Sequence, residues 1–173
     1  MTSPANTVSA KPLLTWLQLL RLPTVFTAMA DILCGFFIGA VSSGPGEPNW
    51  FVLPCLLLSS AGLYLGGMVL NDVFDARLDA VERPERPIPS GRVSTWSAAT
   101  VGGLLLMIGM VAAIAAWSIA GRMGHSLFIA ALTAIAILIY DIFLKTTWAG
   151  PFSMASCRFL NLALGAATAV NAG

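Results

Sequence analysis

One segment near the middle of the sequence concentrates residues that could do chemistry. It carries four oxygen-bearing side chains at close spacing: Asn71, Asp72, Asp75 and Asp79. If one helix runs through them, a turn of about 100° per residue places all four within about 100° of one another. Like charges on one face are costly unless a cation neutralises them. Magnesium accepts one or two carboxylates and substrate phosphate, so this face predicts a hard-cation site with a diphosphate partner.

Prolines and arginines follow the acidic residues. The prolines at 84, 87 and 89 stop a helix and hold the chain extended. The arginines Arg83, Arg86 and Arg92 then fall within reach of the same site. Guanidinium groups bind phosphate oxygens bidentately and offset charge on a departing diphosphate. The alternative is a solvated loop beside a membrane, whose acids and bases pair only with one another.

The elements that must position these residues are transmembrane helices. Apolar residues make up 57% of the 173 residues and charged residues 10%, a balance that is unusual for soluble domains. A spanning helix needs about 20 mostly apolar residues. Such stretches are predicted at 22–41, 50–70, 94–120, 126–144 and 151–170. The predicted fold class is therefore all-α, a multi-span transmembrane bundle of about five helices.

The basic residues predict the orientation of this bundle. In an alternating topology, most of them fall on one side: Lys11, Arg21, Arg77, Arg83, Arg86, Arg92 and Lys145. The positive-inside rule places the N-terminus and residues 72–93 in the cytoplasm. The first apolar stretch is too long for a signal peptide, so we expect the N-terminus to be retained. The net charge of +1 favours neither nucleic acid nor a polybasic lipid anchor.

Further residues inside the predicted helices could pack the bundle or line a pocket. Gly35 and Gly39, and likewise Gly62 and Gly66, have the spacing that lets helices approach closely in lipid. Asp31 lies in the middle of the first stretch, where ionised carboxylates usually face a cavity or a partner. Arg158, which shares a helical face with Asn161, could pair with Asp31 or reach a diphosphate.

The segment also carries a family resemblance. Asn71-Asp72-x-x-Asp75-x-x-x-Asp79, followed by the sequence Arg-Pro-Ile-Pro-Ser-Gly-Arg at 86–92, resembles the first aspartate-rich motif and adjoining loop of the UbiA superfamily of intramembrane prenyltransferases. The resemblance implies a nine-helix bundle, of which 1–173 would be the N-terminal part of a single membrane domain. It implies that Asn71, Asp75 and Asp79 bind Mg²⁺, with Asp72, Asp75 and Asp79 as catalytic residues.

The resemblance extends to other predicted diphosphate contacts, but it has gaps. The predicted contacts are Arg83, Arg86, Arg92, Tyr140, Lys145 and Arg158. Tyr140 and Lys145 sit where the family often has a tyrosine and a lysine, although their spacing differs by one residue from the usual pattern. A second aspartate-rich motif, which family members carry several helices later, is not found in this sequence.

The function that the resemblance implies is Mg²⁺-dependent transfer of a prenyl group. The donor would be an isoprenyl diphosphate, and the acceptor an aromatic or related lipophilic molecule within the membrane lipids. A non-catalytic binder or carrier of isoprenoid diphosphates is the alternative, motivated by the missing second motif.

Overall fold

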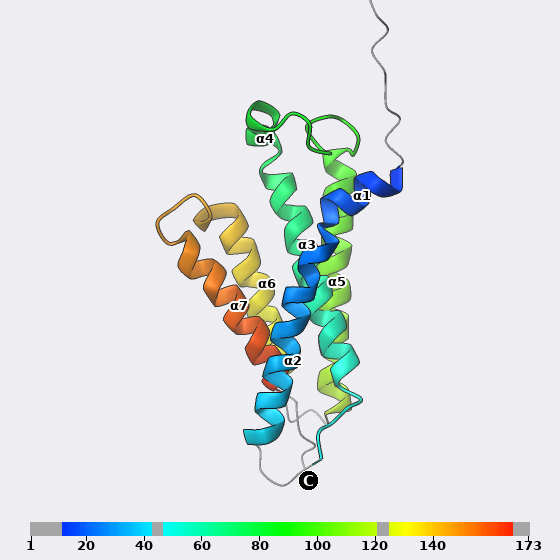
Figure 1. The fold of residues 1–173 in the computed structure, drawn as a ribbon, viewed down its shortest axis with the longest axis vertical. Coiled ribbons are helices and arrows are strands. Elements are labelled where there is room, and N and C mark those ends of the chain that lie inside the picture. The colour runs from blue at the N-terminus through cyan, green and yellow to red at the C-terminus, as the bar shows by residue number, and fades with distance from the viewer. Residues whose placement is uncertain (1–11, 43–46, 121–124, 168–173) are drawn as a thin grey trace, which may run out of the picture.

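The computed structural model describes residues 12–42, 47–120 and 125–167, and the elements in these ranges are helices (Figure 1). They are α1 (Pro12–Leu20), η1 (Leu22–Thr24), α2 (Val25–Ser42), α3 (Leu53–Phe74), α4 (Ala76–Glu82), α5 (Thr95–Ile119), α6 (Ser126–Ile139), the π-helical η2 (Tyr140–Leu144) and α7 (Gly150–Ala166). The all-α prediction is confirmed. The predicted retention of residues 1–11 lies outside the described residues.

Among the described residues, four segments are long and apolar enough to cross a membrane: 13–42, 53–74, 95–119 and 126–144. Large apolar side chains on them face outward, including Phe26, Leu58, Val111 and Phe128. Such side chains are expected where lipid is the solvent. The fifth predicted stretch forms α7, which has 17 residues, and its predicted end at 167–170 lies mostly outside the described ranges. The chain is an integral membrane protein.

The first predicted span differs from the structure at its beginning. Helical structure starts at Pro12 and bends at Arg21, which has a φ of 47° in the left-handed region. Pro23 explains the interruption, because it has no N–H to donate to a carbonyl four residues back and its ring clashes with that carbonyl in an α-helix. The bend sets α1 at an angle to α2, where it packs against α3 (Figure 1).

The second span also differs, at its end. A helix through Asn71 and Asp79 would be continuous, but α3 stops at Phe74 and α4 begins at Ala76. Asp75 between them has a φ of −82° and a ψ of −5°, which is the bridge region of backbone space. The backbone hydrogen bonds still continue, from Asp75 N to Asn71 O (2.9 Å) and from Asp79 N to Asp75 O (2.8 Å). The helical course of the chain therefore continues through Asp75 into α4.

Small residues hold the helices in two closely packed pairs. A Cβ added at Gly62 of α3 would lie 2.7 Å from Gly109 N of α5, and one added at Gly66 would lie 2.9 Å from Gly102 O. In the second pair, Gly35 of α2 packs against the backbone of Leu162 in α7. The close approach predicted for Gly35, Gly62 and Gly66 is confirmed. An apolar core joins the pairs: Ile32, Phe36, Leu56, Leu63, Ala113 and Leu164.

A second apolar cluster fixes the loop that follows α4. Ile88 and Val93 of this loop are buried against Leu19, Val69 and Ala98. Within the loop, Val93 N donates to Pro87 O at 3.0 Å. Ser94 then caps α5 by accepting a hydrogen bond from Ser97 N at 3.0 Å. The loop arginines are therefore carried by a defined backbone at the same end of the bundle as α4.

Candidate diphosphate and metal site

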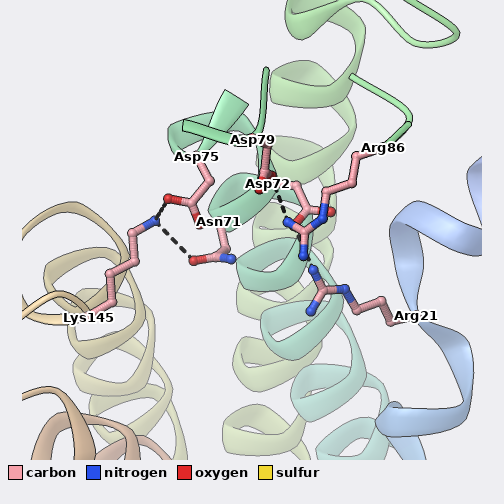
Figure 2. A network of polar contacts seen from close by, with 7 residues as sticks. All are labelled: Arg21, Asn71, Asp72, Asp75, Asp79, Arg86 and Lys145. Carbon is pink, nitrogen blue, oxygen red and sulfur yellow. Dashed lines mark hydrogen bonds and ion pairs between the residues drawn. The ribbon is translucent and has the colours of Figure 1, made fainter. Parts of the chain in front are cut away.

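The predicted acidic residues lie together at the end of α3, but in two pairs (Figure 2). Asp72 and Asp79 turn toward Arg86, whereas Asn71 and Asp75 turn toward Lys145. This division matches helix geometry, since a turn of about 100° per residue puts Asp79 about 20° from Asp72 and Asp75 about 40° from Asn71. Each pair converges on one cationic side chain, so both pairs already form cation-binding arrangements.

Arg86 joins the first pair to the loop. Its Nη1 lies 2.6 Å from Asp79 Oδ2 and 3.4 Å from Asp72 Oδ1. The exposed fractions of the Asp79 and Asp72 side chains are 5% and 7%. Burial alone would lower the pKa of Arg86, but the hydrogen bond to Asp79 and the charges of the three aspartates outweigh it and raise this pKa. Arg86 is therefore a permanent positive charge in the site.

A second arginine, Arg21, also contacts Asp72, although it lies far from Asp72 in the sequence. Arg21 Nη2 lies 2.8 Å from Asp72 Oδ1, across 51 residues of sequence. The left-handed backbone at Arg21 is a strained conformation for a residue with a side chain, and such strain often marks functional sites. Sequence reasoning counted Arg21 only as a flanking charge. The signal that could have identified it is its position directly before the helix-breaking Leu22-Pro23.

Lys145 joins the second pair to the fourth span. Its Nζ lies 2.6 Å from Asp75 Oδ1 and donates to Asn71 Oδ1 at 3.2 Å. The π-helical turn η2 places it there, because Lys145 N donates to Tyr140 O, five residues back, at 3.0 Å. A π-turn accommodates one more residue than an α-turn. Lys145 therefore lies one residue further along the chain than an α-turn from Tyr140 would reach.

Two cavities adjoin this cluster. The outer one has a volume of about 470 Å³ and is lined by Gln18, Arg21, Asp72, Glu85, Arg86, Pro87 and Arg92. Arg92 is held at its rim through Gln18 Oε1 (3.2 Å) and the carbonyl of Glu85 (2.5 Å). Three guanidinium groups around one open pocket form an arrangement that can bind phosphate oxygens.

The inner cavity, also of about 470 Å³, lies between α2, α3, α6 and α7. Its apolar wall includes Leu63, Met68, Ile137 and Met154, and its polar wall includes Tyr64, Tyr140, Asp141 and Asn161. Arg21 lines both cavities. Its guanidinium thus stands where the charged outer pocket meets a cavity within the bundle.

The remaining predicted residues occupy different places. Arg158 pairs with Asp31 through two hydrogen bonds of 2.9 and 3.2 Å, which is one of the two outcomes expected for it, and both residues line the inner cavity. Tyr140 lines the same cavity. Arg83 is exposed at the end of α4 and lines neither cavity. The structure therefore brings Arg86 and Lys145 to the acidic residues, and places Arg83 apart from them.

The oxygen donors fit a magnesium ion that is completed by other ligands. Within the described residues, no group of three or more His, Cys, Asp or Glu side chains is placed to hold a metal ion. Asn71 and Asp75, however, present two hard oxygen atoms to the same cation, Lys145 Nζ. Magnesium commonly takes one or two protein carboxylates and completes its shell with water and phosphate oxygens. The pair therefore suits a magnesium ion that arrives with a diphosphate.

Comparison with known proteins places these features in a family. The model of the UbiA prenyltransferase family matches residues 32–173. The chain is similar to proteins named digeranylgeranylglyceryl phosphate synthase, at 34% identity over 136 residues in Saccharolobus solfataricus and 38% over 120 residues in Ignicoccus hospitalis. These matches cover 76% and 68% of the chain, but 43% and 37% of the relatives. The chain thus spans less than half the length of these relatives.

A solved structure shows the same fold. It comes from a study of digeranylgeranylglyceryl phosphate synthase in membranes, and it superposes with a TM-score of 0.77 at 24% sequence identity. The match covers 90% of this chain and 53% of the other. The helical arrangement therefore agrees with the family match, which extends over most of the sequence. The chain belongs to the UbiA prenyltransferase family.

Proposed function

We propose that the protein transfers a prenyl group from an isoprenyl diphosphate to a lipophilic acceptor within the membrane. The observation that carries the proposal is the position of Arg21 between the two cavities. A diphosphate in the outer pocket would have its prenyl chain directed into the inner cavity, which has an apolar wall. Family membership and the named relatives support this reading.

The cationic side chains would bind the diphosphate. Arg86 and Arg21 lie beside it on the Asp72 side, and Arg92 closes the rim of the pocket. Positive charge at these positions stabilises the charge that develops on the departing diphosphate. A bound Mg²⁺ would supply Lewis-acid charge to a diphosphate oxygen atom on the side of the inner cavity, which Asn71 lines. Asn71 and Asp75 would hold it, and Lys145, which now occupies their oxygen atoms, would be released to a phosphate oxygen.

We propose that Asp72 and Asp79 have a different role from Asn71 and Asp75. Both are almost fully buried and both contact Arg86. They orient its guanidinium toward the outer pocket, and they can hold a second cation when Arg86 turns to phosphate. The predicted ligand Asp79 would then belong to this second position. We also propose that 1–173 is part of one membrane domain.

Two types of acceptor are proposed, alcohols and aromatic molecules. The relatives are named for a product in which geranylgeranyl groups are carried by glyceryl phosphate, so an alcohol is the acceptor type that they support. Aromatic acceptors are the type that the sequence resemblance implied. Both types meet the same requirement, which is a nucleophilic atom held next to the allylic carbon in the inner cavity.

We also propose an orientation for the bundle in the membrane. The cytoplasmic side would be the end with α4, the loop at 83–94 and Lys145. A single cysteine placed at exposed Glu82, in a variant without the three native cysteines, tests this. In inside-out vesicles an impermeant maleimide should label it without detergent. Labelling only in right-side-out vesicles would reverse the topology.

The test of function uses the purified full-length protein in detergent with labelled geranylgeranyl diphosphate. Two acceptors are offered separately, geranylgeranylglyceryl phosphate and 4-hydroxybenzoate. We expect a Mg²⁺-dependent prenylated product that Asp75→Ala abolishes, with Glu82→Gln as an active control. Undiminished turnover by Asp75→Ala contradicts the proposed site. Tight binding of the diphosphate without product from any acceptor would instead support a carrier.

A further inference from the structure

Asp141 is a buried carboxylate that lacks a full set of partners. The residue is 3% exposed, and its Oδ2 has no hydrogen-bond partner within the described part of the chain. Neighbouring acids are paired, since Asp31 contacts Arg158 and Asp75 contacts Lys145. A buried acceptor without a donor costs free energy that any arriving donor group recovers.

The carboxylate belongs to the wall of the inner cavity. Asp141 lines it together with Thr133, Ile137 and Tyr140 from the same span. The carboxylate torsion of aspartate is broad, so rotation about it can turn an oxygen atom toward the cavity. A donor group that enters the cavity can therefore satisfy the carboxylate without rearrangement of the helix.

The structure also explains why no lysine side chain that it describes pairs with Asp141. Lys145, one turn further along η2, is the cation nearest in sequence, but its Nζ is held 2.6 Å from Asp75 Oδ1. The π-turn fixes this division, because it aligns Lys145 with Asn71 and Asp75 while Asp141 stays on the cavity wall. Single π-turns are frequently retained at functional positions.

We propose that Asp141 binds the hydroxyl group of an alcohol acceptor and takes its proton during prenyl transfer. This inference rests on the proposed function and specifies its acceptor. The acceptor oxygen forms a bond to the allylic carbon, while the bond from that carbon to the diphosphate oxygen breaks and the diphosphate leaves with the electron pair. The hydroxyl proton passes to the Asp141 carboxylate, so Asp141 is a catalytic residue that contacts the substrate.

The carboxylate must be ionised to accept the proton, so turnover should rise with pH through its titration. The charged and titratable groups facing it are Lys145 and Tyr140 on its own span, Asp72 and Asp75 on α3, and Cys157 on α7. Asp141→Asn keeps the shape of the side chain but cannot take a proton. This variant should therefore lose the pH-dependent limb that the wild type shows.

The experiment compares Asp141→Asn with the wild type and with Glu82→Gln, a carboxyl-to-amide control at an exposed position of α4. The substrates are geranylgeranyl diphosphate and geranylgeranylglyceryl phosphate. We expect kcat to fall by roughly 10²-fold or more, the usual contribution of a general base, while KM for the diphosphate changes little. The thermal unfolding midpoint of Asp141→Asn should equal or exceed that of the wild type, because no buried carboxylate remains unpaired.

Other outcomes separate this inference from the proposed function. An unchanged kcat and pH profile in Asp141→Asn, with an active wild type, overturns the role of Asp141 and leaves prenyl transfer intact. A wild type that is inactive with alcohols but prenylates 4-hydroxybenzoate overturns the alcohol acceptor.

Acceptor binding can also be measured without turnover. Geranylgeranylglyceryl phosphate alone should raise the unfolding midpoint of the wild type more than that of Asp141→Asn. Equal shifts in the two proteins count against the contact.

Discussion

Removal of Arg86 should destabilise the protein through Asp79 more than through Asp72. Arg86→Ala leaves Asp79, with 5% of its side chain exposed, without its 2.6 Å contact, whereas Asp72 keeps Arg21 at 2.8 Å. Breaking a buried ion pair from one side typically costs about 3–5 kcal/mol. Since 22% of the Arg86 side chain is exposed, water reduces the penalty, and we expect the lower end, roughly 3 kcal/mol.

A double-mutant cycle isolates the cause of this loss. Asp79→Asn removes the charge that Arg86→Ala would leave unpaired, so the double variant should be more stable than Arg86→Ala alone. The coupling between the two positions should be about 2 kcal/mol, within the usual range for residues in one network. The measurement is unfolding in detergent micelles titrated with SDS, followed by far-ultraviolet circular dichroism. Additive effects of the two substitutions would refute the reasoning, because they would mean that Asp79 does not depend on Arg86.

Other substitutions test the packing, the loop and the cation site. Gly35→Leu should prevent α2 from packing on the backbone of α7 and abolish folded protein. Gly103→Ala, whose added Cβ meets no atom within 4 Å, should be neutral or stabilising by up to about 1 kcal/mol. Size-exclusion profiles and unfolding midpoints measure both effects. Gly91→Ala should cost about 1 kcal/mol, because Gly91 has a φ of 74°, and the same unfolding titration measures it. Lys145→Ala should tighten Mg²⁺ binding in the absence of diphosphate, since the lysine no longer competes for Asp75; calorimetry that shows weaker binding would count against this metal site.

The local patterns in the sequence were informative about the elements. Apolar length predicted the spans, because only helices of about 20 residues satisfy their backbone within lipid. The spacing of Gly62 and Gly66 indicated a close helix contact, and the structure supplies α5 as the partner. The acidic and basic residues at 71–92 were likewise expected at one end of the bundle, where the structure has them.

What could not be predicted depends on contacts that are distant in sequence or on small changes of backbone geometry. The pairing of Arg21 with Asp72 joins residues 51 positions apart and depends on the bend before Pro23. The pairing of Asp79 with Arg86 and of Asp75 with Lys145 depends on tertiary packing, which periodicity does not reveal. The π-turn at Tyr140 could be suspected only from a one-residue difference in spacing, and the side that Asp141 faces follows from that turn.

The bridge made by Lys145 also has a mechanical consequence. The inner cavity lies between α2, α3, α6 and α7, and α3 contacts α6 and α7 far less extensively than it contacts α5. Lys145 spans this weaker junction, because it ties the end of the fourth span to Asn71 and Asp75 of the second. A metal ion that displaced Lys145 from Asn71 and Asp75 would remove this link between the second and fourth spans. We therefore expect the width of the cavity to depend on which cation occupies the site, so that metal binding would affect the entry of a bulky lipid.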